Sequence, residues 1–253
     1  MNTDLQNWDD TAVGWDKKIA QPDTFRTLLI TNAMEKLLSD CEGKDILDAG
    51  CGNGYFSNWL RQKGANVVGA DGSDAMIVLA KQQFKDIKFQ TIDFLKSVPY
   101  PDRGFNIVLA NMLLMHMSDI TIFLKEASRI LKPDGTFIFS ILHPCFNEPT
   151  AKLYKSLWHK LIFAKPFALA YDYYSKSRGR YENHLNARLS HYHRTLEEYS
   201  LLLKNSDFTI SELGEPHELP EDFLNKNPKL EYANRLPRFL FFKCIKHDTS
   251  SSI

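Results

Sequence analysis

The chain has 253 residues, of which 43% are hydrophobic and 25% are charged, and its formal net charge is zero. This length and composition fit a globular protein and exclude a low-complexity or strongly charged chain. A net charge of zero creates no global field that would attract nucleic acid or an acidic membrane. No apolar run approaches the roughly 18 residues of a membrane span, so no such span is expected.

The four cysteines are scattered without CxxC spacing, at Cys41, Cys51, Cys145 and Cys244. This pattern predicts reduced thiols in a cytoplasmic protein, with neither a disulfide framework nor a metal site. Residues 1–10 are polar and acidic and lack the apolar stretch of a secretory leader, so no leader is expected.

The hydrophobic pattern predicts alternating helices and strands over the first 143 residues. An approximate 3.6-residue apolar period predicts a helix over 22–40. Short apolar strands are expected at 45–49, 66–71, 87–93, 105–111 and 136–142, with helices at 53–63, 73–84 and 119–131 between them. Uniformly apolar strands that alternate with helices are typical of a parallel sheet covered on both faces.

The pattern changes after His143. Residues 144–193 are rich in Tyr, Phe, Trp, Lys and Arg and show no alternation of strand and helix. A helix is then expected at 195–205, followed by strands at 208–213 and 238–246 with no convincing helix between them. These last two strands are expected to pair antiparallel at one edge of the sheet.

A glycine-rich turn, Asp48-Ala49-Gly50-Cys51-Gly52-Asn53-Gly54, ends the first strand and opens the next helix. Glycine suits a sharp turn with positive φ, and the free N–H groups at a helix start can hold a polar ligand. The G-x-G-x-G spacing differs from the G-x-G-x-x-G fingerprint of dinucleotide sites. Asp48 would repel a pyrophosphate but would suit an ammonium group. The turn therefore favours a ligand with a cationic head over a nicotinamide cofactor.

Acidic residues end the next two strands. Asp71 could accept both hydroxyls of a ribose, although an Asp in this place could equally cap the helix that follows. Asp93 could accept the amino group of an adenine while Phe94 packs on its ring. The alternative for Asp93 is an ordinary turn.

Taken in order, these motifs resemble those of the class I S-adenosylmethionine-dependent methyltransferases. The resemblance implies a doubly wound α/β domain with a mostly parallel seven-stranded sheet, a reversed last strand and S-adenosylmethionine as cofactor. The matching segments are Asp48-Ala49-Gly50-Cys51-Gly52-Asn53-Gly54, Gly69-Ala70-Asp71, Asp93-Phe94, Phe105-Asn106-Ile107-Val108 and Leu131-Lys132-Pro133-Asp134-Gly135.

The resemblance also assigns contacts. It places the glycines of the turn along the methionine part of the cofactor, Asp71 at the ribose, and Asp93 with Phe94 at the adenine. Ala110 and Asn111 would approach the amino or carboxylate group of the methionine. The full expected set is Trp15, Asp48, Gly50, Cys51, Gly52, Asn53, Gly54, Asp71, Gly72, Asp93, Phe94, Ala110 and Asn111.

The N-terminal segment resembles the aromatic segment that folds over the cofactor in this family. Trp8 and Trp15 could face the sulfonium, since Trp faces attract cations, or could serve as plain hydrophobic anchors. The expected organisation is one domain over 1–253. It comprises cap helices at 1–43, a cofactor-binding core at 44–143, a substrate lid at 144–193 and the last part of the sheet at 194–247.

Three histidines are candidates for contact with the methyl acceptor. His116 follows the fourth strand, His143 ends the fifth and His193 precedes Arg194. Histidine titrates near neutral pH and can act as a base, although a lone histidine is more often structural. The segment 144–193 interleaves basic and aromatic residues. This pattern fits a lid over an anionic or aromatic small molecule, an RNA surface, or an ordinary solvated cover.

The sequence favours a methyltransferase that acts on an oxygen, nitrogen or carbon of a small molecule by in-line displacement. A tRNA methyltransferase and a non-catalytic protein that binds S-adenosylmethionine are the alternatives. A nicotinamide oxidoreductase is a fourth and remote hypothesis. Neither the acceptor nor the oligomeric state follows from the residues.

Overall fold

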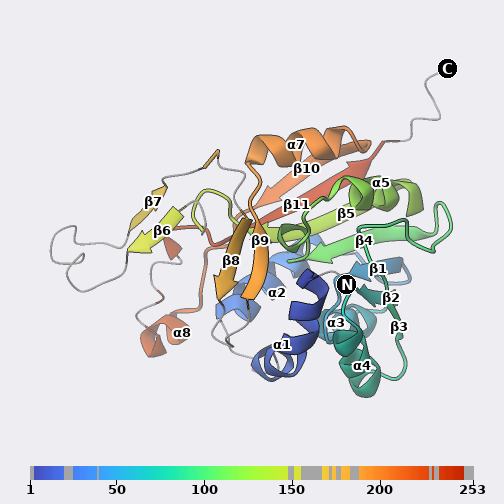
Figure 1. Cartoon of the computed structure of the whole chain (residues 1–253), viewed down its shortest axis with the longest axis horizontal. Helices are drawn as coiled ribbons and strands as arrows, with labels where there is room; N and C mark the ends of the chain where they lie inside the picture. The colour runs from blue at the N-terminus through green and yellow to red at the C-terminus, as the bar shows by residue number, and fades with distance from the viewer. Residues whose placement is uncertain are drawn as a thin grey trace.

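The structure is a computed structural model. It describes residues 3–19, 25–38, 40–147, 151–154, 167–170, 173–174, 178–182, 188–227, 230 and 234–247. These parts form one seven-stranded sheet between two layers of helices, with two short hairpins at one end (Figure 1). The predicted fold class is therefore confirmed.

The sheet has the strand order β10-β11-β5-β4-β1-β2-β3. Within the run β5-β4-β1-β2-β3, all neighbouring strands are parallel. Strand β11 runs antiparallel to both β5 and β10. The predicted antiparallel pair at one edge is therefore confirmed. The strands are β1 (Asp45–Ala49), β2 (Asn66–Asp71), β3 (Lys88–Thr91), β4 (Phe105–Asn111), β5 (Leu131–Leu142), β10 (Phe208–Gly214) and β11 (Phe239–Lys246).

Helices cover both faces of the sheet. Those of the N-terminal half lie on one face, and α5 and α7 lie on the other (Figure 1). The helices are α1 (Thr3–Ile19), α2 (Phe25–Leu37), α3 (Tyr55–Gln62), α4 (Asp74–Gln83), α5 (Thr121–Ile130), α7 (Leu196–Lys204) and α8 (Glu221–Lys226), with a 3₁₀ turn, η1, at Leu114–His116.

The strand order reverses at β1, which pairs with β2 on one side and with β4 on the other. Connections leave β1 and β4 toward opposite faces of the sheet at this point. Ligands of doubly wound sheets bind beyond the carboxyl ends of the strands at such a point, and this region is called the crevice below. The glycine turn lies at this crevice.

Two expectations about the elements were wrong. The strand expected from residue 136 begins at Leu131, because Leu131 already pairs with Phe105 of β4. Helix α8 lies between the last two strands, where no helix was expected; it has six residues and no buried side chain, so no apolar period marked it.

The described parts of the segment 144–193 contain two antiparallel strand pairs, which the sequence did not predict. These are β6 (Ala151–Tyr154) with β7 (Phe167–Ala170) and β8 (Arg178–Glu182) with β9 (Arg188–Tyr192).

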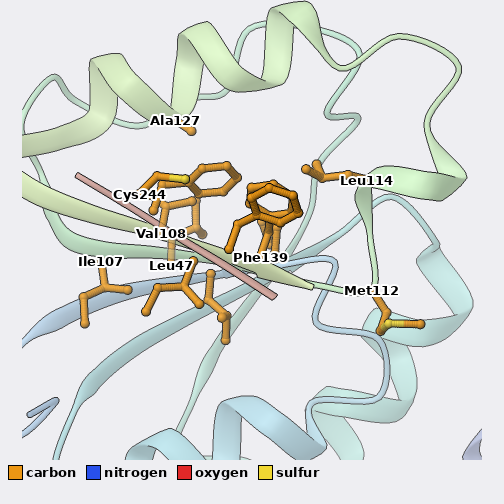
Figure 2. Close-up of a cluster of buried hydrophobic side chains, with 14 of the residues drawn as sticks. Leu47, Ile107, Val108, Met112, Leu114, Ala127, Phe139 and Cys244 are labelled. Carbon is orange, nitrogen blue, oxygen red and sulfur yellow. The ribbon is translucent and has the colours of Figure 1, made fainter. Parts of the chain in front are cut away.

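The core lies on both faces of the central strands. Ala127 projects from α5 toward one face of the sheet, while Ile107 points to the opposite face (Figure 2). Phe139 of β5 is fully buried and stacks on Phe242 of β11 with ring centroids 4.5 Å apart. Burying a phenyl side chain contributes about 1.5–3 kcal/mol, so this stack anchors β11 to the rest of the sheet.

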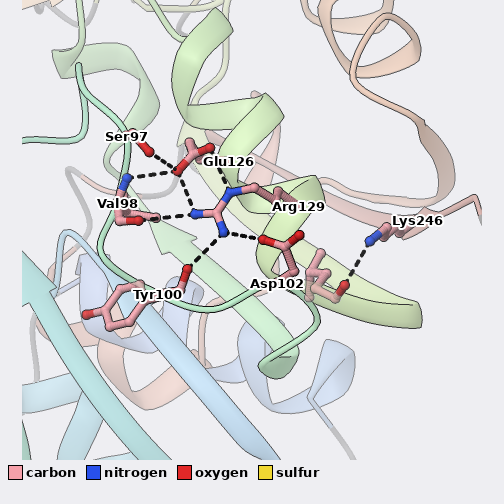
Figure 3. A network of polar contacts seen from close by, with 8 residues as sticks. Ser97, Val98, Tyr100, Asp102, Glu126, Arg129 and Lys246 are labelled. Carbon is pink, nitrogen blue, oxygen red and sulfur yellow. Dashed lines mark hydrogen bonds and ion pairs between the residues drawn. The ribbon is translucent and has the colours of Figure 1, made fainter.

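Arg129 of α5 ties down the connection between β3 and β4. Its guanidinium donates to the carbonyl oxygens of Val98 and Tyr100 and to the carboxylates of Asp102 and Glu126 (Figure 3). The Arg129 guanidinium lowers the pKa of Glu126 to about 2. The connection runs back to the amino end of β4, so this network stabilises the side of the sheet that faces away from the crevice.

Candidate functional site

The glycine turn adopts a backbone that L side chains rarely reach. Gly50, Gly52 and Gly54 have φ values of 73°, 55° and 80°. A Cβ atom on Gly50 would lie 2.9 Å from Cδ1 of Leu113, and one on Gly54 would lie 2.7 Å from Cζ of Phe89. All three glycines suit the positive φ of the turn, and at Gly50 and Gly54 the close neighbours also leave no space for a Cβ.

Backbone hydrogen bonds hold the turn against the second strand. The N–H groups of Gly50 and Cys51 both donate to the carbonyl oxygen of Ala70, over 2.7 and 3.0 Å. Gly54 is the N-cap residue of α3 and supplies no side-chain cap. The N–H of Tyr55, the first residue of α3, donates to Oδ1 of Asn53 at 3.3 Å. A helix start that follows a glycine turn is a place where a polar ligand group can bind.

Asp48 lies beneath the turn and is 1% exposed. The hydroxyl of Ser57 in α3 donates to its Oδ2 over 2.6 Å. Burial raises the pKa of Asp48 to about 7. A buried carboxyl group of this kind becomes stable as an anion when a cation binds beside it. The sequence motif did not reveal Ser57, which lies nine residues after Asp48 and shares no motif with it.

Asp71 joins the glycine turn to the loop after β2. Its Oδ2 accepts from the N–H of Gly52 and its Oδ1 from the N–H of Ser73, each over 2.9 Å. Burial raises the pKa of Asp71. The cap of α4 is the Ser73 hydroxyl, which accepts from the N–H of Met76, so Asp71 does not cap this helix directly.

The remaining expected cofactor residues lie at the ends of β2, β3 and β4. Asp93 accepts from the N–H of Leu95 and forms an ion pair with Lys96 at 3.1 Å. Phe94 is 5% exposed and packs edge-on against Phe123, so its ring lies in the core. Ala110 is fully buried, the Asn111 side chain accepts from the hydroxyl of Ser140, and Gly72 lies under Leu5 of α1.

Helix α1 lies across the crevice and is held there by two aspartates. Asp9 accepts from the Ser73 hydroxyl and from the N–H of Ala75 at the start of α4. Asp16 accepts from the side-chain amide groups of Asn53, in the glycine turn, and of Gln83 in α4. The sequence identified the tryptophans of this segment but not these aspartates, whose partners lie far along the chain.

Trp8 and Trp15 pack edge-on in α1 with ring centroids 5.6 Å apart. Trp8 also packs edge-on against His116, at 5.0 Å. The Nδ1 atom of His116 lies 2.8 Å from the carbonyl oxygen of Ser190 in β9. A carbonyl oxygen can only accept, so Nδ1 carries the hydrogen and Nε2 is the basic nitrogen of the ring.

His143 and His193 are also held by hydrogen bonds. The N–H of Cys145 donates to Nδ1 of His143, whose Nε2 lies 2.8 Å from Oε1 of Glu215. Burial lowers the pKa of His143, and the Cys145 contact requires a neutral Nδ1 acceptor. The Nε2 atom of His193 lies 2.8 Å from the carbonyl oxygen of Tyr173.

A small hollow lies between the end of β5, strand β9 and the start of α7. Its cavity volume of about 10 Å³ leaves room for little more than one water molecule, far below the roughly 300–1,000 Å³ of a typical small-molecule site. His143 and His193 line it together, whereas His116 lies outside it near His191, with ring centroids 6.5 Å apart. Its lining residues are Leu142, His143, Pro144, Asn147, His191, His193, Arg194 and Tyr199.

Two further properties of the described residues bear on function. They contain no group of three or more His, Cys, Asp and Glu side chains that could hold a metal ion. None of the helices among them has the length and apolar character needed to cross a bilayer.

Residues 47–139 match the family described as methyltransferase domain. Residues 47–139 therefore form a methyltransferase domain, and the fold of the chain is that of S-adenosylmethionine-dependent methyltransferases. The match spans the glycine turn, both acidic strand ends and β4, and the family implies S-adenosylmethionine as cofactor. The resemblance found in the sequence is therefore confirmed.

The chain is similar to named methyltransferases. It is 33% identical over 151 residues to the demethylmenaquinone methyltransferase of Tropheryma whipplei, covering 56% of this chain and 62% of that protein. It is 34% identical over 111 residues to the malonyl-[acyl-carrier protein] O-methyltransferase of Serratia marcescens, covering 43% of each chain. The chain thus spans less than two thirds of the length of these relatives.

The fold of this methyltransferase domain is shared more widely than its sequence. A crystal structure of an S-adenosylmethionine-dependent methyltransferase from Mesorhizobium loti superposes with a TM-score of 0.73 at 23% identity. The superposition covers 85% of this chain and 96% of that one. At this identity the likeness concerns the fold alone.

Proposed function

We propose that the protein transfers a methyl group from S-adenosylmethionine to an oxygen, nitrogen or carbon of a small molecule. The observation that carries this proposal is the buried carboxyl of Asp48 beneath a glycine turn at the switch point of the sheet. A carboxyl group with a raised pKa in this place fits an amino-acid ammonium group and disfavours a pyrophosphate. The two named relatives act, by their names, on a quinone precursor and on a carrier-bound malonyl group.

Each part of the cofactor has a candidate partner in the chain. The glycine turn, with Cys51 and Asn53, would line the methionine part above Asp48. Asp71 and Gly72 would hold the ribose, and Asp93 with Phe94 the adenine. Ala110 and Asn111 would approach the amino or carboxylate group, and Trp15 would cover the site from α1.

The cofactor, when bound, supplies a methyl group on a sulfonium that leaves as a neutral thioether. The chain's own contribution is to exclude water and to align the acceptor with the methyl carbon, which can provide much of the rate enhancement. Helix α1 and the segment 144–193 serve as covers in this proposal. His116, His143 and His193 are the candidates for acceptor contact.

The proposal keeps the sequence-based organisation of one domain over 1–253, with parts 1–43, 44–143, 144–193 and 194–247. It also keeps the cytoplasmic location, which the four free cysteines support. A small-molecule acceptor is preferred to tRNA because the formal net charge is zero.

Two measurements test the proposal. Calorimetry with S-adenosylmethionine and with its demethylated product should detect binding of both to the purified protein. Incubation with methyl-labelled cofactor should then place label in a metabolite fraction. Absence of binding would reject the cofactor, whereas label in an RNA fraction alone would establish the tRNA alternative. Binding without transfer to any fraction would establish the non-catalytic alternative.

A further inference from the structure

His116 lies on a turn that packs against the glycine turn. It is the last residue of η1, the 3₁₀ turn that follows β4. Leu113, which precedes this turn, lies over Gly50, since its Cδ1 would be 2.9 Å from a Cβ added there. Side chains three residues apart lie on the same side of a 3₁₀ turn. The His116 ring therefore lies on the side of η1 on which Leu113 meets the crevice.

Two elements far apart in the chain hold the His116 ring. Trp8 of α1 packs edge-on against it, with ring centroids 5.0 Å apart. The carbonyl oxygen of Ser190 in β9 lies 2.8 Å from its Nδ1 atom. Because a carbonyl oxygen can only accept, Nδ1 carries the hydrogen, and in the neutral ring the lone pair is on Nε2. Strand β9 therefore selects one of the two tautomers of His116.

Asp4 of α1 fastens strand β9 in the position that makes this contact. The hydroxyl groups of Ser190 and Tyr192 each donate to one oxygen of its carboxylate, over 2.6 and 2.7 Å. Ser190 thus binds α1 through its side chain and His116 through its main chain. A movement of β9 that broke the contacts with Asp4 would also displace the carbonyl oxygen that selects the tautomer.

The other two candidate histidines use their ring nitrogens differently. Nδ1 of His143 accepts from the N–H of Cys145, and its Nε2 lies 2.8 Å from the Glu215 carboxylate, so both nitrogens of this ring are engaged. His193 is 9% exposed and donates from Nε2 to the Tyr173 carbonyl oxygen. His116 is only half-buried, and its main-chain contact is made by Nδ1, the nitrogen without the lone pair. Of the three, His116 is the best suited to accept a proton.

We propose that His116 accepts the proton of the methyl acceptor at Nε2, and that Ser190 and Asp4 are positioning residues for this step. The acceptor is then a compound with an O–H or N–H group at the atom that receives the methyl group. The term acceptor rests on the proposed function. The tautomer of His116 and its dependence on β9 rest on the structure alone.

The proposed step balances without any further reactant. The O–H or N–H bond of the acceptor breaks, and its proton moves to Nε2 of His116. The electron pair that remains on oxygen or nitrogen forms the bond to the methyl carbon, while the carbon–sulfur bond breaks and leaves its pair on sulfur. His116 becomes an imidazolium ion, which strengthens the hydrogen bond from Nδ1 to the Ser190 carbonyl oxygen.

The first test determines the His116 tautomer in the protein without ligand. Protein labelled with ¹⁵N-histidine is studied by NMR at about pH 8, where a histidine with an ordinary pKa is neutral. The ¹⁵N shifts show which ring nitrogen carries the hydrogen, and the signals lost in His116→Asn, or in His116→Gln if that variant does not fold, assign the residue. We expect the hydrogen on Nδ1 and none on Nε2. A hydrogen on Nε2 would overturn the proposal.

Variants of α1 and β9 test the positioning residues. Asp4→Ala should reduce the fraction of His116 with its hydrogen on Nδ1, because β9 is no longer fastened to α1. Asp10→Ala, on the same helix, should leave this fraction unchanged. If Asp4→Ala does not fold, Ser190→Ala removes only the hydroxyl group that reaches Asp4 and should act in the same direction. A tautomer that is unchanged in Asp4→Ala and in Ser190→Ala would show that neither residue positions His116.

The second test concerns methyl transfer and is done with His116→Asn. The Asn side chain can still donate to the Ser190 carbonyl oxygen but has no basic nitrogen. Its affinity for the demethylated cofactor, measured by calorimetry, should equal that of wild type. Its transfer of label from methyl-labelled cofactor to a metabolite fraction should fall about a hundredfold or more. Equal transfer by the variant and wild type would overturn the proton-accepting role.

The two tests separate this proposal from the proposed function. Absence of cofactor binding or of label transfer in wild-type protein would reject the proposed function, and with it the role of His116 toward an acceptor. The NMR measurement would still decide whether β9 positions His116. Cofactor binding and transfer by wild type, together with undiminished transfer by His116→Asn, would reject the present proposal alone.

Discussion

Ser190 of strand β9 donates its hydroxyl to Oδ1 of Asp4 in helix α1 over 2.6 Å, although 186 positions separate the two residues. The Tyr192 hydroxyl donates to the other carboxylate oxygen over 2.7 Å. The Ser190 carbonyl oxygen meanwhile contacts His116. Strand β9 therefore joins the N-terminal helix to the segment after β4.

Removing the Asp4 carboxylate should loosen strand β9. Asp4→Ala leaves two hydroxyl groups without their acceptor and should cost about 1–3 kcal/mol of unfolding free energy. A double-mutant cycle with Ser190→Ala should give a coupling energy of about 0.5–2 kcal/mol from chemical unfolding. Amide exchange at 188–192 should also accelerate.

Asp10→Ala is the matched control for Asp4→Ala, because Asp10 lies on the same helix and accepts a hydrogen bond from the exposed side chain of Gln6. It should change stability by less than about 0.5 kcal/mol. A coupling energy near zero between Asp4 and Ser190 would show that this hydrogen bond does not stabilise the contact between helix α1 and strand β9.

Asp48→Asn should separate stability from cofactor binding. The pKa of Asp48 in the folded protein is about 7, above the value near 3.9 of an unfolded Asp. The folded state therefore holds more protons between these values, and stability falls as pH rises from about 4 to 7. At pH 8 Asp48→Asn should retain or increase the unfolding free energy, yet weaken cofactor binding at least tenfold in calorimetry.

Asp45→Asn provides the control on the same strand. Asp45 lies at the amino end of β1 and pairs with Lys132 at 2.8 Å, away from the crevice. The Asp45→Asn variant should leave cofactor affinity unchanged. Equal loss of affinity in both variants would remove the proposed role of Asp48.

Cofactor binding should release a proton near pH 6. At that pH Asp48 is mostly protonated in the free protein, and an ammonium group beside it would favour the anion. Calorimetry in two buffers of different ionisation enthalpy measures this release directly. Wild-type protein should release close to one proton, and Asp48→Asn clearly less; identical values would exclude a titrating Asp48 at the ligand.

Gly54→Ala should destabilise the protein by about 2–4 kcal/mol, because a positive φ disfavours Ala and its Cβ would overlap Phe89. Gly43→Ala is the matched control: its φ of 66° is similar, but no atom lies within 4 Å of the added Cβ. That control should cost only about 1 kcal/mol in thermal unfolding. Similar losses at the two positions would mean that φ alone, without the close packing on β3, requires glycine.

Glu126→Gln should remove stability that depends on pH. The pKa of Glu126 is lowered by Arg129 to about 2, so its contribution is present above about pH 4.3 and disappears as pH falls toward 2. The variant should be less stable than wild type at pH 7 by about 1–2 kcal/mol and equal to it near pH 2. Chemical unfolding at the two pH values measures the difference in unfolding free energy. A loss of the same size at both pH values would contradict the ion-pair explanation and would indicate an effect of side-chain packing.

The sequence was sufficient for the central elements because their signals are local. Apolar runs such as Phe105–Asn111 predicted β4 with its observed bounds. Helix α8 escaped prediction because it buries no side chain. The sequence also did not predict the strand pairs β6–β7 and β8–β9. Strand pairing depends on where the chain reverses, and amino-acid composition does not encode these reversals.

What the amino-acid sequence determined by itself is the type of sheet and the glycine turn, since strand periodicity and the need for positive φ act within a few residues. Only the tertiary structure decided which distant side chains meet: Asp4 with Ser190, Ser57 with Asp48, and Arg194 with three carbonyl groups. The burial of Asp48, and hence its raised pKa, arises from packing between elements far apart in the chain. No local pattern carries that information, because the free energy of a buried charge depends on all the groups that surround it.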